Sequence, residues 1–246
     1  MGVDWLAPDW PAPASVRALS TMRGGGVSLP PYGSLNLGDH VGDAPAAVAQ
    51  NRSRLRTAAK VPAEPAWLAQ VHGVDVRDLD GNAPGPDRAD AAVTREPGRV
   101  CAILTADCLP VLLAADSGDA VGAAHAGWRG LCAGVIEATV RSLGRAPKSL
   151  LAWLGPGIGP LHFEVGDEVR EALVRADPGA EAAFEPNARG RFMADLPALA
   201  RRRLEHLGVE RIYGGGMCTF GDPGRYFSHR RDGRTGRQGT LIWLAP

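Results

Sequence analysis

Three short apolar segments in the middle of the chain constrain its fold more than any other feature. They cover residues 100–104, 111–115 and 120–125, and the turn-forming residues 116–119 (DSGD) separate the second segment from the third. Each segment is bounded by turn signals and is short for a helix, which is typical of strands buried on both faces. The sequence therefore predicts neighbouring strands inside a core.

A helical pattern follows these strands. From Gly127, apolar residues recur every three or four positions as far as Leu143, and Gly144 ends the predicted helix. Further helices are expected over 165–174 and 196–207, and further strands over 149–154, 209–213 and 241–244. Strands and helices mixed along one chain favour an α/β or α+β fold of layered sheets and helices.

The size and charge of the chain exclude several classes of protein. With 246 residues it can bury a sizeable core. Apolar segments resume on both sides of the loop-like stretch 82–87, so we expect one domain over 1–246 with that stretch as an exposed loop. Basic and acidic residues both number 27, which gives a formal net charge of zero. Bulk charge therefore does not favour binding to nucleic acid or to a membrane surface.

The sequence shows no membrane span and no secretion signal. It lacks an apolar run of about 18 residues, and its N-terminus lacks a basic start followed by an apolar stretch. We therefore expect a cytoplasmic protein whose cysteines are thiols rather than a disulfide framework. Cys101, Cys132 and Cys218 are expected to be small residues of the core.

Three residues with metal-binding or nucleophilic side chains lie at the predicted ends of elements. His72 precedes a glycine, Cys108 lies between two predicted strands, and His125 lies where a strand passes into a helix. If they converge, two imidazoles and a thiolate suit Zn2+ and leave a fourth position for water or substrate. Their long spacings are not a metal motif, so each residue can equally be a structural one.

Two stretches of the chain have features of anion sites. The first amides of a helix are unpaired and its dipole is positive there; Gly127 lets an anion approach this backbone, and Arg129 adds charge. The alternative is that the glycines at this helix start serve packing. The arginine-rich stretch 224–237 can likewise bind phosphate or be a solvated loop.

A series of short motifs runs in order along the chain, from about residue 17 to residue 244. The motifs are TMRGGGVS (21–28), SLNLG (34–38), HVGD (40–43), NR (51–52), QVHG (70–73), DA (90–91), TADCLP (105–110), HAGWRG (125–130), GPGIG (155–159), FEVG (163–166), CT (218–219) and SHRRD (228–232). Together they resemble the YfiH-like laccase-domain family, also called the polyphenol oxidase or purine nucleoside phosphorylase family. Met22, where the family usually has threonine, is a small departure from its pattern.

The resemblance implies a fold, a metal centre and an activity. The implied fold is a single layered α/β (α+β) domain of mixed β-sheets flanked by helices, similar to the cytotoxic necrotizing factor catalytic domain. His72, Cys108 and His125 are implied to be the zinc ligands and the catalytic centre. The implied reaction is phosphorolysis of adenosine, inosine, guanosine or methylthioadenosine to base and sugar 1-phosphate, with adenosine deamination at the same site.

These reactions suggest further candidate residues. Phosphorolysis needs a phosphate site and stabilisation of developing charge, for which the candidates are Arg52, Gly127, Arg129 and Arg230. Deamination needs an activated water and a proton acceptor, and the sequence does not choose between Asp107 and Glu164. The expected ligands are purine nucleosides and phosphate, and the expected state is a monomer or homodimer.

Three other functions can use the same residues. A His2Cys set also suits copper with an axial methionine (Met22, Met193 or Met217), as in a copper phenol oxidase, although few histidines remain for a multicopper cluster. Cys108 and His125 can instead be nucleophile and base of a Cys-His hydrolase. The third alternative is a metal-binding accessory protein without enzymatic activity.

Overall fold

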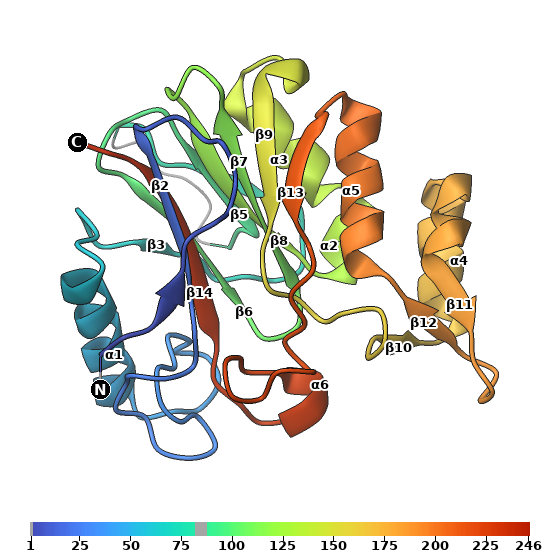
Figure 1. Ribbon diagram of the computed structural model, residues 1–246, viewed down its shortest axis with the longest axis horizontal. Coiled ribbons are helices and arrows are strands. Elements are labelled where there is room, and N and C mark those ends of the chain that lie inside the picture. The colour runs from blue at the N-terminus through green and yellow to red at the C-terminus, as the bar shows by residue number, and fades with distance from the viewer. Residues whose placement is uncertain (1, 82–87) are drawn as a thin grey trace.

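Two mixed β-sheets face each other at the centre of the structure, with helices on their outer sides (Figure 1). This computed structural model describes residues 2–81 and 88–246. The loop expected over 82–87 lies outside the described residues. The mixed arrangement of sheets and helices confirms the predicted fold class.

The first sheet has five strands in the order β1-β2-β14-β6-β3. Their bounds are β1 (Trp5–Leu6), β2 (Val16–Thr21), β14 (Gln238–Leu244), β6 (Val100–Thr105) and β3 (Ala66–Trp67). β14 pairs antiparallel with both β2 and β6, and β3 pairs in parallel with β6. The last strand of the chain therefore lies in the middle of this sheet.

The second sheet has six strands in the order β13-β9-β7-β8-β5-β4. Their bounds are β13 (Arg211–Gly214), β9 (Leu150–Leu154), β7 (Leu109–Ala115), β8 (Val121–Ala126), β5 (Ala91–Thr94) and β4 (Val76–Asp78). β7 and β8 form an antiparallel hairpin, while the outer pairs β13–β9 and β4–β5 are parallel. A separate small sheet contains β10 (Glu164–Val165), β12 (Phe192–Ala194) and β11 (Phe184–Pro186).

Helices lie around the sheets, and some of them cover the outer faces of the two large sheets. They are α1 (Pro45–Ala58), α2 (Trp128–Ala133), α3 (Val135–Leu143), α4 (Asp167–Ala176), α5 (Leu196–Leu207) and α6 (His229–Asp232), with short 3-10 turns at Pro147–Ser149 and Pro178–Ala183. α1 packs against the five-stranded sheet through Leu55. α3 packs on β4, β5 and β8, and α5 packs on α3 (Figure 1).

Alternate residues of the central strands face different layers of the core. In β6, Ile103 packs between the two sheets, whereas its neighbour Leu104 faces the layer that contains α1. In β7, Leu112 packs between the sheets, whereas Leu113 faces the helices on the other side. Burial on both faces explains why these strands are continuous apolar runs in the sequence.

Most predicted elements are present. Two predicted helices and the predicted burial of one cysteine are corrected. The helix expected from Gly127 to Leu143 is two helices, because Gly134 has a φ of 101° and interrupts the helical backbone. The helix expected over 165–174 begins at Asp167, because Val165 pairs in β10. Cys218 is not a core residue: its Sγ accepts a hydrogen bond from the Gly159 amide and lines a cavity.

The other two non-ligand cysteines agree with the prediction. Cys101 is fully buried, and Cys132 is half-buried against the core.

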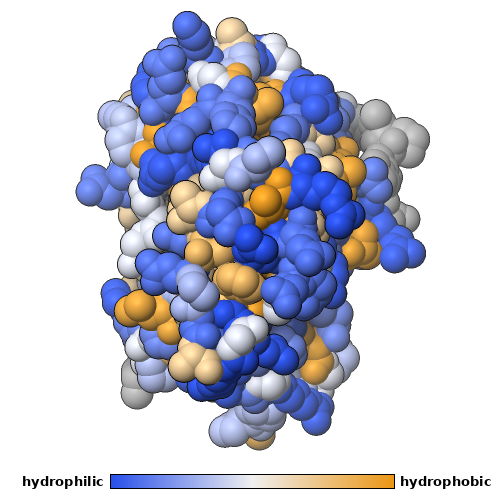
Figure 2. All heavy atoms as spheres, turned by 90° about the vertical axis from the view of Figure 1, so that its right-hand side faces the viewer, coloured by the Kyte–Doolittle hydropathy of each residue, from blue (hydrophilic) through white to orange (hydrophobic). Residues whose placement is uncertain are grey.

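The surface offers two observations that bear on partners. Within residues 2–81 and 88–246, no helix is both long enough and apolar enough to cross a membrane. Figure 2 shows the face on the right-hand side of Figure 1, where hydrophilic side chains cover most of the surface and hydrophobic ones are scattered among them.

Candidate metal centre

The three residues singled out from the sequence converge in the structure. One ligand atom from each of His72, Cys108 and His125 lies within 4.8 Å of the others. His72 Nε2 is 3.7 Å from Cys108 Sγ, and the two imidazole centroids are 4.7 Å apart. This cluster of one thiol and two imidazoles suggests a metal ion.

The fold brings the three residues together at one end of the second sheet. Cys108 lies in the short connection between β6 and β7, where the chain passes from one sheet to the other. His125 lies near the end of β8, opposite Pro110 of β7, so the hairpin register places it beside Cys108. His72 lies in the loop between β3 and β4, with a positive φ of 61°.

A fully buried carboxylate holds both histidines in position. Asp90 Oδ1 pairs with His125 Nδ1 at 2.8 Å and accepts the amide of His72 at 2.9 Å. Its Oδ2 accepts the amides of Val71 and Gly73 at 3.1 and 2.7 Å. Asp90 therefore fixes the loop that carries one histidine and the ring orientation of the other.

The sequence analysis names Asp90 only within a family motif, without a role. The signal that could have found it is its setting, ADAA, in which one carboxylate precedes a strand and is surrounded by small apolar residues. A charged side chain buried in such a setting needs several partners.

Charge and burial act in opposite directions on the cluster. Burial raises the pKa of the Cys108 thiol, but the positive charge of His125 and hydrogen bonds from both histidines outweigh it and lower the pKa to about 6. Burial lowers the pKa of His125, but the charge of Cys108 and the hydrogen bond to Asp90 raise it to about 9. Without a metal, the pairing therefore favours the thiolate of Cys108 and the imidazolium of His125.

The donor set fits a tetrahedral metal ion. Zinc bonds of about 2.3 Å to sulfur and about 2.0 Å to nitrogen place two such ligands about 3.5 Å apart, close to the separation of His72 and Cys108. Because His125 Nδ1 is engaged by Asp90, Nε2 is the ring nitrogen left for a metal. Three protein ligands leave a fourth position for water or substrate.

The pairing of Cys108 with His125 predicts that the stability of the metal-free protein depends on pH. A thiol with a pKa lowered to about 6 contributes stability that is complete above its unfolded value of 9.0 and is lost as pH falls through 6. A histidine with a pKa raised to about 9 contributes stability that is complete below 6.5 and is lost as pH rises through 9.

An NMR titration of chelator-treated protein measures the pKa of His125, on which this pH dependence rests. The His125 imidazole is expected to lose its proton near pH 9, and to do so at lower pH in Cys108→Ser, because the serine carries no negative charge. An unchanged midpoint in the variant would contradict the pairing.

Asp107 and Arg230 lie next to the cluster and are tied to each other. Asp107 has a φ of 93°, and its carboxylate accepts the Thr219 hydroxyl at 2.7 Å and the Arg230 amide at 2.6 Å. The Arg230 guanidinium donates to the Glu164 carbonyl at 2.7 Å and lies over the ring of Phe163. The structure therefore brings Asp107, Glu164 and Arg230 into one connected group beside Cys108.

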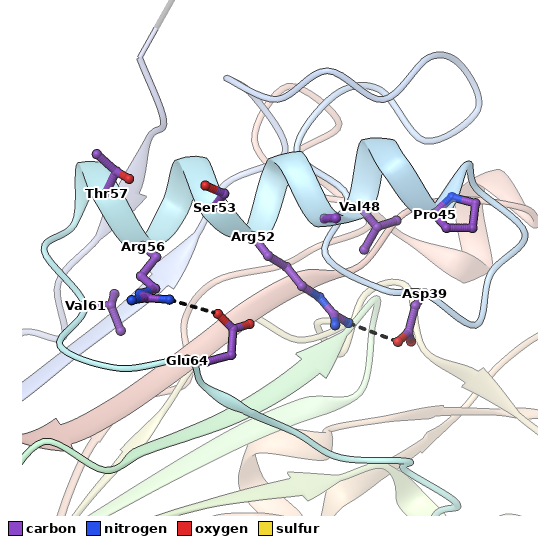
Figure 3. A pocket seen from close by; sticks show the side chains of 10 residues that line it. Asp39, Pro45, Val48, Arg52, Ser53, Arg56, Thr57, Val61 and Glu64 are labelled. Carbon is purple, nitrogen blue, oxygen red and sulfur yellow. Dashed lines mark hydrogen bonds and ion pairs between the residues drawn. The ribbon is translucent and has the colours of Figure 1, made fainter.

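Arg52 and Arg129 are held by contacts outside the cluster. Arg52, on α1, donates to the Leu37 carbonyl at 2.8 Å, pairs with Asp39 at 3.4 Å and stacks on Trp67. It lines a pocket of about 720 Å³ beside α1 (Figure 3). Arg129 is exposed and its guanidinium lies 4.4 Å from the ring centroid of Trp128. Neither guanidinium contacts the three residues of the cluster in these interactions.

Arg237 is a positive group that the sequence analysis includes only in an arginine-rich stretch. Burial lowers the pKa of its guanidinium, while the negative charges of Cys108 and Asp107 act in the opposite direction. Its amide donates to Asn36 Oδ1 at 2.9 Å, which anchors the backbone there. Arg237 therefore places a positive charge within electrostatic reach of the cluster.

Gly127 lies against Cys108 and His72. We therefore expect that a single methyl group added at this position lowers the affinity of the site for metal. A Cβ at this position would lie 2.9 Å from Cys108 Sγ and 3.0 Å from His72 Cδ2. Gly127→Ala is therefore expected to displace both side chains and lower metal affinity about 10- to 100-fold. Competition with a metal chelator measures this. Gly24→Ala, where a Cβ meets nothing within 4 Å, should be neutral, and equal affinities in the two variants would contradict the expectation.

Comparison with known proteins adds to this geometry. Residues 17–245 match a family described as multi-copper polyphenol oxidoreductase laccase. The chain is 54% identical over 239 residues to purine nucleoside phosphorylase YfiH of Escherichia coli (strain K12), an alignment that covers 97% of this chain and 98% of the relative. It is 56% identical over 241 residues to purine nucleoside phosphorylase PA4543 of Pseudomonas aeruginosa, with 98% of each covered.

Solved structures agree with these matches over the whole fold. The crystal structure of Neisseria meningitidis protein NMB0706 superposes with a TM-score of 0.93 at 47% identity and covers 98% of this chain and 99% of that one. YlmD from Geobacillus stearothermophilus superposes with a TM-score of 0.90 at 34% identity, covering 98% and 96%. With its motifs, its fold and its relatives in agreement, the chain belongs to the YfiH-like laccase-domain family.

Proposed function

We propose that this protein is a zinc-dependent purine nucleoside phosphorylase whose catalytic centre is His72, Cys108 and His125, with adenosine deamination at the same site. The observation that carries the proposal is the convergence of these three side chains, whose ligand atoms lie within 4.8 Å of one another and leave a fourth coordination position for water or substrate. The names of two relatives that are 54% and 56% identical to this chain, both purine nucleoside phosphorylases, support the reaction class. We also propose that the protein is a single domain, that it acts in the cytoplasm as a monomer or homodimer, and that it binds neither nucleic acid nor a membrane.

Each residue of the site has a definite task in this proposal. A zinc ion bound by the three ligands supplies a Lewis acid and a water of lowered pKa. Asp90 keeps the His125 ring oriented and holds the His72 loop. Arg237 supplies positive charge beside Cys108 for phosphate or for charge that develops on the leaving base.

Glu164 and Arg230 are proposed to contact substrate. Both line a cavity of about 530 Å³, together with the ring of Phe220. Of the two candidate proton acceptors, Asp107 has both oxygens engaged by Thr219 and Arg230. In Glu164, Oε2 accepts the Asn187 amide at 2.8 Å and lies 3.6 Å from Arg189, which leaves Oε1 to take a proton. We therefore assign the proton acceptor to Glu164 and a positioning role to Asp107. Arg52 and Arg129, whose guanidinium groups are engaged elsewhere, remain candidates for a more distant part of a phosphate site.

The family description favours copper as the second candidate metal. Two of the methionines considered as axial ligands make other hydrogen bonds: Met217 Sδ accepts the Tyr226 hydroxyl, and Met193 Sδ accepts the Asn187 amide, both at 3.7 Å. We therefore propose that copper can occupy the site but is not its working metal. Elemental analysis of protein purified without added metal tests this, and predominance of copper would overturn it.

The reaction is tested by product analysis. Purified protein of known metal content is incubated with adenosine, with and without phosphate, and the products are separated by chromatography. Adenine and ribose 1-phosphate that form only with phosphate indicate phosphorolysis, and inosine formed without phosphate indicates deamination. If adenosine, inosine and methylthioadenosine all remain unchanged in the presence of bound zinc, the proposal fails. A covalent acyl adduct on Cys108 would instead favour the hydrolase.

A further inference from the structure

A cysteine and a histidine outside the metal centre lie in contact with each other. Cys218 Sγ is 3.4 Å from His162 Nδ1. The same sulfur accepts backbone hydrogen bonds from Gly159 at 3.2 Å and from Gly221 at 3.3 Å. The His162 ring stacks on Phe220 with 4.6 Å between centroids, which holds the imidazole in place. Within the described part of the chain, neither residue belongs to the metal-type cluster.

The partners of Cys218 are hydrogen-bond donors and an imidazole. Two N–H groups point at the sulfur, and an imidazole next to it can take its proton. Cys132 has the opposite environment, because its Sγ–H donates to the Ala172 carbonyl at 3.5 Å. Both cysteines are half-buried, so the difference lies in their hydrogen-bond partners rather than in access. Cys132 is therefore a matched internal reference for the reactivity of Cys218.

Cys218 and His162 also open onto a cavity that can hold a small molecule. The cavity measures about 490 Å³, and its apolar walls come from Pro160, Leu161, Pro197, Ala198 and Met217. Its charged residues are engaged: Asp195 accepts the Ala198 amide at 2.9 Å, and Arg201 donates to the Ile212 carbonyl at 3.0 Å. The space beside the sulfur therefore suits an uncharged, apolar group.

We propose that Cys218 and His162 form a second reactive site, at which Cys218 is covalently modified by small uncharged electrophiles with an apolar substituent, such as α,β-unsaturated carbonyl compounds. His162 takes the thiol proton, and the sulfur forms a bond to the β-carbon. The π electrons of the carbon–carbon double bond move toward the carbonyl, and the resulting enolate takes the proton back from the imidazolium. The product is a thioether, and no oxidant or reductant is consumed.

The test measures modification of each cysteine in the full-length, zinc-loaded protein. N-phenylmaleimide is added at neutral pH, and peptide mass spectrometry follows the labelling of Cys218 and Cys132 with time. Cys218 is expected to react at least about tenfold faster than Cys132. Equal rates, or labelling of Cys218 only after unfolding, would overturn the proposal. The measurement does not use nucleoside turnover, so its outcome is independent of the proposed function.

Two variants test the role of each part of the site. His162→Phe keeps a ring on Phe220 but removes the nitrogen, and it is expected to slow labelling of Cys218 about 10- to 100-fold. His206→Phe, on the exposed end of α5, is the matched control and should change nothing. An unchanged rate in His162→Phe would overturn the role of the imidazole.

Ala198→Phe places an aromatic ring in the cavity that Ala198 lines with Cys218 and His162. It is expected to slow N-phenylmaleimide more than the smaller N-methylmaleimide. If both reagents kept their rates in this variant, the cavity would not be the binding site for the apolar group. Because the two reagents are compared within one variant, a general loss of folding cannot imitate the expected result.

Discussion

Replacing Asp90 with alanine is expected to destabilise the protein by about 3–5 kcal/mol and to abolish metal binding at neutral pH. The substitution leaves the amides of Val71, His72 and Gly73 without their acceptor. It also removes the hydrogen bond that fixes the orientation of the His125 ring. Both consequences follow because this carboxylate is fully buried and makes every one of these bonds.

Urea unfolding and elemental analysis measure the two effects of Asp90→Ala. Asp177→Ala is the matched control, since Asp177 is also a buried carboxylate, paired with Arg202, but lies away from the cluster. The control should keep its full metal content. An Asp90→Ala protein that retained its metal and lost less than about 1 kcal/mol would contradict the positioning role.

Replacing Cys108 with alanine is expected to lower metal affinity more than about 100-fold and to reduce nucleoside turnover to background. The thiolate is the one sulfur ligand and the one negatively charged ligand of the cluster. Without it, two imidazoles hold the metal and His125 loses part of the interaction that raises its pKa. The loss therefore affects both the charge and the geometry of the site.

Chelator competition and product chromatography measure the effect of Cys108→Ala. Cys132→Ser is the control for a cysteine outside the cluster, and it should bind metal and turn over substrate as the parent protein does. Turnover in Cys108→Ala equal to that of the control would show that the three-residue centre does not carry the reaction.

The fold could be predicted best where hydrophobic periodicity alone decides the structure. β6, β7 and β8 are buried on both faces, so each is a continuous apolar run that can be recognised without knowledge of its neighbours. α5 has the predicted bounds because Asp195 caps its start and Gly208 ends it.

Elements that depend on tertiary contacts could not be predicted in this way. The sequence analysis does not predict α1, because its buried face combines Val48 and Leu55 with the polar Asn51. Asn51 is buried because its side chain bonds the backbone of a distant loop, including the Asn36 carbonyl at 2.8 Å. A pattern of apolar residues carries no sign of such a contact.

In the candidate site too, residue type reveals some of the residues, and only contacts across the fold reveal the others. His72, Cys108 and His125 could be selected because few residue types bind metals and each lies at an element end, and their convergence is confirmed. Asp90 and Arg237 were not selected, because their importance comes from contacts across the fold rather than from residue type. The prediction that Cys218 lies in the core is wrong. Its sulfur accepts the amides of Gly159 and Gly221, and a pattern of apolar residues does not reveal such contacts.

The most direct test of the account is a metal titration followed by activity. Protein stripped of metal is given increasing zinc, and phosphate-dependent release of adenine from adenosine is measured at each bound stoichiometry. We expect activity to rise from background in proportion to bound zinc up to one equivalent, and to stay at background in His72→Ala at every addition. Full activity in the stripped protein, or in His72→Ala, would contradict a metal-dependent phosphorylase centred on these three residues.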